Sequence, residues 1–199
     1  MSAALFPEDV QFLQRLLRSA GCFRGPITGE WGADTDAAER DFSARCLTIA
    51  GRFDPCDERS ERNIRTLHVR AQEVARRFLA SARATGLDVR IISGTRSYAE
   101  QDRLYRIGRY GDTRAVVTRA RGGRSNHNFG IAWDIGVFED GRYLSDSPLY
   151  DRAAQLGLEP GLEWGGAWPS FPDRPHYQLA TGLSTRDVRA RFEAGQSFV

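Results

Sequence analysis

Lysine is absent from this sequence, and its 28 basic residues are all arginine. Against 26 acidic residues they leave a formal net charge of +2, which is too small to indicate a nucleic-acid-binding protein. An arginine-only composition is typical of a GC-rich genome, and it also suits an anionic partner such as a cell-wall polymer. Long apolar runs are absent too, since none approaches the roughly 20 residues that a membrane-spanning helix needs. We therefore expect a protein that binds no nucleic acid and spans no membrane.

Cysteine is scarce, with only Cys22, Cys46 and Cys56 and no CxxC motif. An odd number without metal-type spacing argues against a disulfide framework, although a Cys46–Cys56 bridge stays open. The N-terminus has no basic segment before an apolar core, and Glu8 and Asp9 follow at once, so no signal peptide is expected. We expect a monomer that is synthesised in the cytoplasm.

The N-terminal part of the chain reads as two helices around a glycine-rich loop. Residues 8–20 place Val10 and Leu17 on one helical face, and Gly21 is the expected C-cap. A second helix is expected to begin with Asp34 or Thr35 as its N-cap. On pattern alone, this segment is either a module of its own or a small helical lid of the main domain.

Residues 9–42 resemble the peptidoglycan-binding module found at the ends of many wall hydrolases. The resemblance rests on a Leu-Gln pair, a glycine-spaced loop and a Thr-x-x-Ala motif, here Leu13, Gln14, Gly21, Gly25, Ile27, Gly29, Gly32, Thr35 and Ala38. It implies a small all-helical wall-binding module over residues 1–50. A polar linker at 51–60 and a second domain at 61–199 would follow.

The second domain reads as an α+β fold, in which helices flank a small, mostly antiparallel sheet. One long amphipathic helix is expected from Glu61 to Thr85, followed by a short buried strand in LDVRIISG and a helix in SYAEQDRLYRIGR. From Gly130 onward the residues alternate between the two faces of a strand, and RPHYQLA forms a further strand. The last segment, STRDVRARFEAG, is expected to be a solvated helix.

Asp134 lies in the middle of an apolar strand. A buried carboxylate without a cationic partner is costly, so either an arginine or a metal ion should face it. His127 lies where the same strand begins, and another strand supplies His176, three residues after Asp173. Two imidazoles and one carboxylate, with water in the open position, form a catalytic zinc set. The alternative is that these histidines are structural, as we expect for His68 in the long helix.

The stretch SNHNFGIAWD matches Ser-x-His-x-x-Gly-x-Ala-x-Asp. This is the zinc signature of the superfamily containing D-alanyl-D-alanine carboxypeptidases, VanX-type dipeptidases and the hedgehog domain. More narrowly, SGTRSYAEQDRLYRIGR, VTRARGGRSNHNFGIAWDIGVF and LEWGGAWPSFPDRPHYQL resemble the L-alanyl-D-glutamate peptidases used as phage endolysins. The likeness implies a hedgehog/D-Ala-D-Ala peptidase-like fold and a zinc metallopeptidase that hydrolyses peptidoglycan.

Carried over to this sequence, the resemblance makes His127, Asp134 and His176 the ligands of a Zn²⁺ ion. It gives Asp173 the role of the catalytic carboxylate, and Arg96 the role of steadying the oxyanion. Ser125, two residues before the first ligand, would contact the substrate or support a ligand.

Aromatic residues just before the catalytic pair are candidates for the substrate cleft. Trp164 and Trp168 would line it, although aromatic side chains suit a core equally well. Glu163 would bind substrate or support the fold. Gly165 and Gly166 suggest a tight turn that lets the backbone approach the substrate.

The expected function is hydrolysis of the L-alanyl-D-glutamate bond of peptidoglycan stem peptides by a phage endolysin. Such an enzyme would pass through holin lesions and act on the wall during host lysis. An antibacterial effector released by a secretion system and a D-alanyl-D-alanine carboxypeptidase with the same metal site are the alternatives. A non-catalytic wall-binding or signalling protein is a further one, and the presence of Asp173 and Arg96 argues against it.

Overall fold

The computed structural model describes residues 6–157 and 161–199. Their elements are, in order, α1 (Pro7–Ser19), α2 (Ala33–Ala50), α3 (Glu58–Arg65), α4 (Val69–Ala84), β1 (Asp88–Ser93), α5 (Tyr98–Arg106), the 3-10 turn η1 (Asn126–Phe129), β2 (Ala132–Glu139), β3 (Arg142–Leu144), α6 (Leu149–Gly157), β4 (Leu162–Trp164), the 3-10 turn η2 (Gly165–Ala167), β5 (His176–Leu179) and α7 (Thr185–Glu193). Within these residues, no helix has the length and apolar character needed to cross a bilayer.

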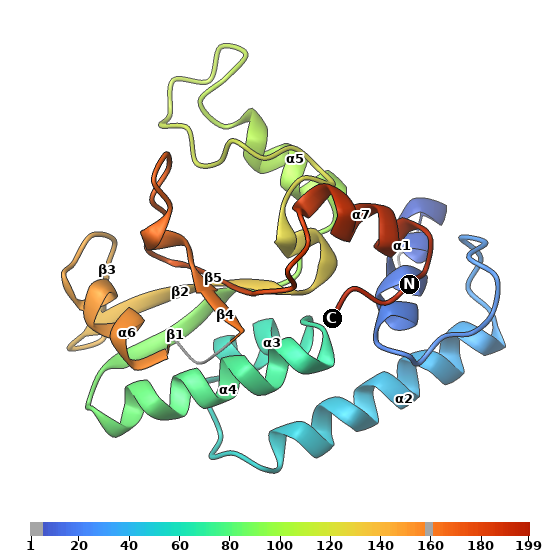
Figure 1. The fold of residues 1–199 in the computed structure, drawn as a ribbon, viewed down its shortest axis with the longest axis horizontal. Helices are drawn as coiled ribbons and strands as arrows, with labels where there is room; N and C mark the ends of the chain where they lie inside the picture. Colours follow the sequence, from blue (N-terminus) through green and yellow to red (C-terminus); the bar gives the residue numbers. More distant parts are fainter. Residues whose placement is uncertain (1–5, 158–160) are drawn as a thin grey trace. The chain divides into compact units, whose positions relative to one another are not determined.

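The strands form one small sheet in which β2 is central. The strand order is β1-β2-β5-β4, β3 pairs with the C-terminal end of β2, and every pairing in the described chain is antiparallel. On β2 the side chains of Trp133, Ile135 and Val137 are fully buried, as the alternating pattern predicts. Helices α3 and α4 pack against β1, and α4 also packs against α6 (Figure 1). The predicted α+β class is therefore confirmed.

The contacts of the chain group into two compact units. Unit 1 comprises Met1–Ala44, Arg96–Phe129 and Leu183–Val199, and unit 2 comprises Arg45–Thr95 and Gly130–Gly182, in each case as far as the residues are described. Unit 2 contains the sheet. In unit 1 an aromatic cluster joins distant parts of the sequence, because the ring of Phe192 lies 5.8 Å from that of Phe12 and 5.3 Å from that of Phe129. The predicted modules at 1–50, 51–60 and 61–199 stay a prediction.

Gln14 holds the glycine-rich loop of the N-terminal segment. Its buried side-chain oxygen accepts hydrogen bonds from the backbone N–H groups of Thr28 and Gly29, at 3.0 and 3.1 Å. Its amide nitrogen donates to the carbonyl of Glu30 and to Oγ1 of Thr35. Four hydrogen bonds from one side chain explain why glutamine suits this position, since each buried polar group of the loop needs a partner.

The ends of the N-terminal helices differ slightly from expectation. The C-cap of α1 is Ala20, one residue before the predicted Gly21, which follows it with a φ of 74°. However, α2 begins at Ala33, which makes Gly32 the N-cap, so the predicted N-cap at Asp34 or Thr35 is wrong by two or three residues. Asp34 and Thr35 lie in the first turn instead, where Thr35 serves as the acceptor for Gln14.

The single helix predicted from Glu61 to Thr85 is wrong, because the chain breaks into α3 and α4 at residues 66–68. His68 is the N-cap of α4, and its Nδ1 accepts a hydrogen bond from the backbone N–H of Arg70. Its own N–H donates to the carbonyl of Gly130 at 2.8 Å, next to the start of β2. These contacts confirm the structural role predicted for His68.

Helix α7 differs from what the sequence predicted, and the cysteines settle a question that the sequence left open. Helix α7 is not simply solvated, since Val188 and Phe192 are fully buried and the helix packs against α1 and η1. All three cysteines are free thiols, so the Cys46–Cys56 bridge is not formed. Burial raises the pKa of the Cys46 thiol.

A buried ion pair joins α3 to α4. The Nη1 and Nη2 atoms of Arg76 each lie 2.7 Å from a carboxylate oxygen of Glu61. The Arg76 side chain is 1% exposed and that of Glu61 is 19% exposed. The hydrogen bond from Arg76 lowers the pKa of Glu61, so the pair's contribution to stability is present above the unfolded-state pKa and is lost as pH falls through the folded-state pKa.

We expect Glu61→Gln to lower the free energy of unfolding by about 3 kcal/mol at neutral pH, because it leaves the Arg76 charge buried without its partner. At about pH 3, below the ordinary glutamate pKa of about 4.3, the deficit should be smaller, because the pH then approaches the lowered pKa of Glu61 in the folded protein. Urea denaturation at both pH values measures it. Glu58→Gln is the matched control on α3, because Glu58 is 86% exposed and pairs with the exposed Arg62. It should cost less than about 0.5 kcal/mol, and equal losses in the two variants would contradict the prediction.

Candidate metal centre

Asp134 and His176 face each other on neighbouring strands. They are direct partners in the register of β2 and β5, so the pleat directs both side chains to the same face of the sheet. Nδ1 of His176 lies 3.3 Å from a carboxylate oxygen of Asp134. The two side chains are 8% and 17% exposed.

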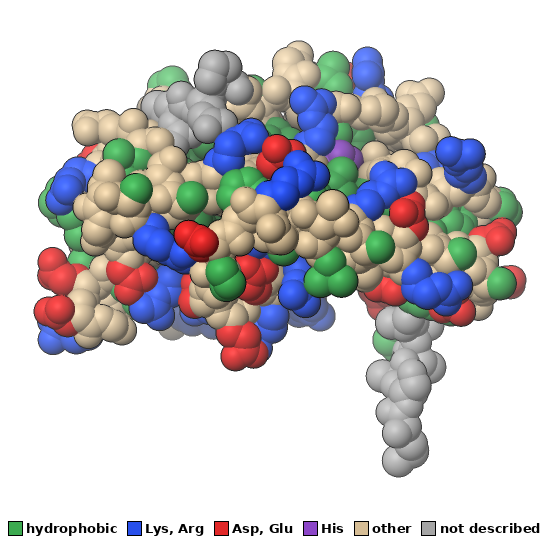
Figure 2. Space-filling model, turned by 90° about the horizontal axis from the view of Figure 1, so that it is seen from below, with side chains coloured by type: hydrophobic (Ala, Val, Ile, Leu, Met, Phe, Trp, Pro, Cys, Tyr) green, Lys and Arg blue, Asp and Glu red, His purple; other side chains and the backbone are tan. Residues whose placement is uncertain are grey.

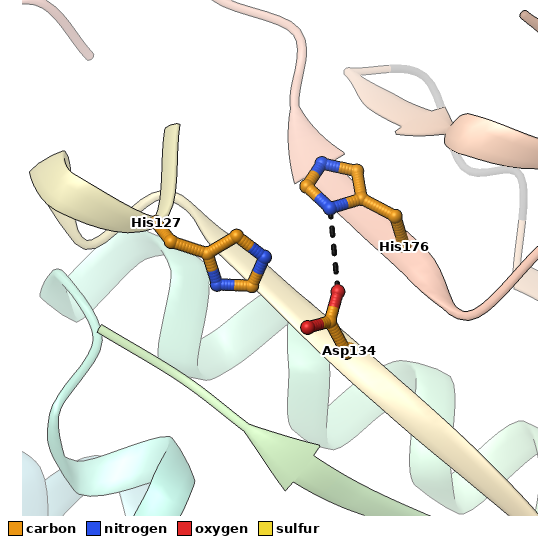
Figure 3. Close-up of side chains that lie close together, drawn as sticks. All are labelled: His127, Asp134 and His176. Carbon is orange, nitrogen blue, oxygen red and sulfur yellow. Dashed lines mark ion pairs between the residues drawn. The ribbon is translucent and has the colours of Figure 1, made fainter. Parts of the chain in front are cut away.

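His127 is supplied by the turn η1, just before β2. The turn is held by Asn128, whose backbone N–H donates to the carbonyl of Ser125 and whose side chain donates to the carbonyl of Arg96 at 2.8 Å. Asn128 is completely buried and His127 is 2% exposed. One ligand atom each from His127, Asp134 and His176 lie within 4.8 Å of one another, and Figure 3 shows the three side chains converging. The structure thus brings together the three residues predicted as metal ligands.

The hydrogen bonds of His176 show which of its nitrogens suits a metal. Its Nε2 lies 3.0 Å from the side-chain oxygen of Gln178, and the Gln178 amide nitrogen donates to Glu163 at 2.6 Å. Because Glu163 accepts from the amide nitrogen, the Gln178 oxygen is turned toward the imidazole and Nε2 must carry a proton. Nδ1, which faces Asp134, is then the nitrogen with a lone pair for a cation.

The electrostatics of His176 agree with this assignment. Burial acts to lower the pKa of His176, but the hydrogen bond and charge of Asp134 outweigh it, with Gln178 and Asp173 adding to the effect, so the pKa is raised. A site that favours a proton on Nδ1 offers a negative environment to a cation. A metal ion would take the place of that proton. Two imidazoles and one carboxylate therefore fit a divalent metal ion with an open coordination position.

Gln178 is a candidate supporting residue that the sequence pattern did not single out. It stands two residues after His176, and the alternation of a strand places both on the same face, which was the available signal. Glu163 on β4 pairs in register with Gln178. Glu163 therefore supports the His176–Gln178 contact, which favours the supporting role among the two considered for it.

We expect Gln178→Leu to lower the affinity for the metal ion by about 10- to 100-fold, because the proton on Nε2 of His176 loses its acceptor. Competition with a chromogenic chelator measures the affinity. Gln155→Leu, an equivalent change at an exposed position of α6, should leave the affinity unchanged. An unaltered affinity in Gln178→Leu would show that the carboxamide does not orient the ligand.

Asp173 is clamped next to His176 but is outside the group of three ligand atoms. Its backbone N–H donates to the carbonyl of Gly165 at 2.9 Å, and its carbonyl accepts from the N–H of His176 at 3.1 Å. A Cβ at Gly165 would lie 2.7 Å from the Asp173 carbonyl oxygen, so only glycine lets the two segments approach this closely. Asp173 is close enough to raise the pKa of His176. Its role as catalytic carboxylate stays a prediction.

Arg96 lies beside the other histidine ligand. Its backbone N–H donates to the carbonyl of His127 at 3.1 Å, and its guanidinium donates to the side-chain oxygen of Gln101. Gln101 is completely buried and donates to the carbonyl of Ala120, so it positions the arginine from α5. Nothing in the sequence pattern pointed to Gln101.

The aromatic residues proposed for the cleft have structural contacts. Trp168 packs on the imidazole of His176 with ring centroids 4.9 Å apart, and Trp164 donates from its indole nitrogen to the carbonyl of Arg174. A Cβ at Gly166 would overlap the Trp164 ring. Gly165 and Gly166 thus allow close packing within the protein, a different use from the predicted approach to substrate. Binding of substrate by Trp164, Trp168 and Ser125 stays a prediction.

Residues 118–179 match the M15 peptidase model described as D-alanyl-D-alanine carboxypeptidase. The peptidoglycan L-alanyl-D-glutamate endopeptidase CwlK of Bacillus subtilis (strain 168) is 37% identical over 124 residues, which cover 57% of this chain and 73% of CwlK. The chain belongs to the M15 peptidase family.

Among solved structures, the L-Ala D-Glu endopeptidase ChiX of Serratia marcescens is similar to this M15 peptidase. The TM-score is 0.50 at 27% sequence identity, over 64% of this chain and 90% of ChiX. The predicted superfamily and the predicted class of enzyme, a metallopeptidase, are thereby confirmed. The matched residues 118–179 include His127, Asp134, Asp173 and His176.

Proposed function

We propose that this M15 peptidase hydrolyses the L-alanyl-D-glutamate bond of peptidoglycan stem peptides with a Zn²⁺ ion held by His127, Asp134 and His176. The observation that carries the proposal is the gathering of these three ligand atoms within 4.8 Å in a chain that is 37% identical to CwlK. Zinc suits two imidazoles and a carboxylate with one position left open. The likeness to ChiX supports the choice of bond.

When bound, zinc supplies a Lewis acid that polarises a carbonyl group and makes water a better nucleophile near neutral pH. Asp173 accepts the proton of the attacking water and delivers it to the departing amine, as a general base and then a general acid. Arg96 stabilises the negative charge that develops on the carbonyl oxygen. Gln178 and Glu163 keep the imidazole of His176 in the tautomer that leaves Nδ1 free.

Digestion of purified muropeptides followed by mass spectrometry tests the proposal. A new free N-terminus on D-glutamate is the expected product. Release of D-alanine would instead identify a D-alanyl-D-alanine carboxypeptidase, the second candidate, which is favoured by the description of the matching family. Intact muropeptides after incubation with zinc-loaded enzyme would contradict both.

The N-terminal segment is proposed to bind the wall. Its support is the hydrogen-bonded loop around Gln14, which is built from the residues that resemble a peptidoglycan-binding module. Holding the enzyme on its polymer raises the effective substrate concentration without new catalytic contacts. Co-sedimentation of the full chain with insoluble peptidoglycan, compared with a Gln14→Ala variant, tests this role. Equal sedimentation would contradict it.

We also propose a lytic role for a monomeric enzyme that reaches the wall from the cytoplasm through a membrane lesion, as a phage endolysin does. An effector released by a secretion system is the alternative. Expression in a bacterial cytoplasm with and without a co-expressed holin tests this route. Lysis only in the presence of the holin is expected, and lysis without it would contradict the proposal.

A further inference from the structure

A basic pocket of about 900 Å³ lies within unit 1, between the loop at residues 119–124 and helix α7. Its volume falls in the range of ordinary ligand sites. The side chains and backbone that define its charge and shape are Arg119, Gly123, Arg124, Arg186, Arg189 and Glu193. Four arginines against one glutamate leave an excess of three positive charges. On the face drawn in Figure 2, by contrast, basic and acidic side chains are interspersed.

Arg189 is held in place and pairs with Glu193, the one carboxylate among the residues that line the pocket. Its guanidinium lies over the ring of Tyr98 at 5.6 Å, and its Nε donates to Glu193 at 2.8 Å. Gly123 makes room for it, because a Cβ there would lie 2.9 Å from the guanidinium carbon. The hydroxyl of Tyr98 also donates to Glu193. Glu193 is therefore engaged and does not neutralise the remaining arginines.

Arg124 and Arg186 are two exposed arginines of the pocket. In the described part of the chain their guanidinium groups form no ion pair or hydrogen bond. Guanidinium groups that share a pocket repel one another, and an anion between them removes the repulsion. Their planar, forked donors match the two oxygens of a carboxylate.

The pocket is close to the candidate metal centre along the chain. Gly123 and Arg124 precede His127 by four and three residues, and the N–H of Gly123 donates to the side chain of Asn128 at 2.9 Å. The four residues from Gly123 to His127 can span at most about 14 Å, so Gly123 and His127 lie no farther apart than that. A bound peptide of about four extended residues has the same length. One peptide can therefore reach from the pocket to His127.

We propose that this pocket is a subsite for the peptide substrate, in which Arg124 and Arg186 bind free carboxylates of the stem peptide. The inference rests on the proposed function, since it assumes that the same peptide is cut at the metal. A stem peptide contains D-glutamate and a free C-terminus, so it is an anion of the chemistry that the pocket accepts. The pocket thereby selects for unmodified carboxylates over amidated ones.

The test compares two synthetic stem peptides, one with free carboxylates and one with the same groups amidated. The zinc-loaded full chain is measured as wild type, as Arg124→Gln/Arg186→Gln and as Arg103→Gln/Arg106→Gln. The last pair is the matched control, because both arginines are exposed on α5 and line no part of the pocket. Steady-state KM and kcat are determined at low and at high salt.

We expect the pocket variant to raise KM for the free peptide by about ten-fold or more with little change in kcat, since charge-assisted contacts are lost on binding. KM for the amidated peptide should stay within about two-fold, and high salt should reduce the difference between the peptides. An equal rise for both peptides, or none, would overturn the proposal. The proposal would also be overturned if the pocket variant lost affinity for inorganic polyphosphate and for neither peptide. That result would assign the pocket to a phosphate polymer.

Failure of the proposed function gives a different result. In that case the wild type cleaves neither peptide. Fluorescence anisotropy with labelled peptides then measures whether the pocket binds them, independently of cleavage. Tighter binding of the free peptide that depends on Arg124 and Arg186 supports the subsite. Binding that is indifferent to both arginines overturns it.

Discussion

Asp173→Asn is expected to reduce kcat for peptide hydrolysis by about 10²- to 10⁴-fold while the protein keeps its metal ion. Asparagine has nearly the shape of aspartate but cannot take up a proton, and Asp173 is outside the three-residue ligand group. The backbone hydrogen bonds that clamp this position to Gly165 and His176 do not involve the side chain, so the local fold should persist. Metal content by mass spectrometry and turnover of a stem peptide measure the two effects.

The control for this variant is Asp54→Asn, an equivalent change at an exposed residue between α2 and α3. It should alter neither metal content nor turnover. Near wild-type turnover in Asp173→Asn would show that another group transfers the proton. Loss of the metal ion in the same variant would show that Asp173 is a ligand.

His127→Ala is expected to remove both the metal ion and the activity. The remaining donors, Asp134 and His176, come from the sheet alone, and two ligands hold a divalent ion far less tightly than three. Affinity should fall by more than the roughly 100-fold that marks the upper range for residues that only support a ligand. Equilibrium dialysis with zinc and the same peptide assay measure the outcome.

His68 provides the matched control for the loss of an imidazole, because it is buried but serves as the N-cap of α4. His68→Ala should cost about 1 kcal/mol of stability and leave zinc affinity unchanged. If His127→Ala retained zinc as well as His68→Ala does, the assignment of the metal centre would be wrong.

Much of the fold followed from periodicity. The alternation around Trp133 and Ile135 predicted β2, and the helical spacing of Val10 and Leu17 predicted α1, because burial on one face imposes the period of the element. The break at residues 66–68 was missed because apolar residues continue at helical spacing on both sides of it. His68 caps a helix there through a hydrogen bond to the backbone, and the spacing of apolar residues does not indicate such a bond.

The short elements between β2 and β5 were not predicted. β3 and β4 have only three residues each, too few for an alternating pattern to be recognised, and they exist because they pair with β2 and β5. The three metal-binding candidates could be chosen from motif spacing. Gln178, which contacts His176, and Gln101, which contacts Arg96, could not be chosen in this way, because their importance depends on hydrogen bonds formed only in the folded chain.

The register between β2 and β5 has a consequence for the metal-free form of the enzyme. Because backbone pairing already sets Asp134 opposite His176, that half of the binding site is assembled by folding itself. Small proteins whose metal ion organises the chain unfold when it is withdrawn, whereas here backbone pairing and buried side chains hold the sheet. The enzyme should therefore stay folded but inactive when its metal ion is removed. Activity would return when a metal ion binds, with no refolding step to delay it.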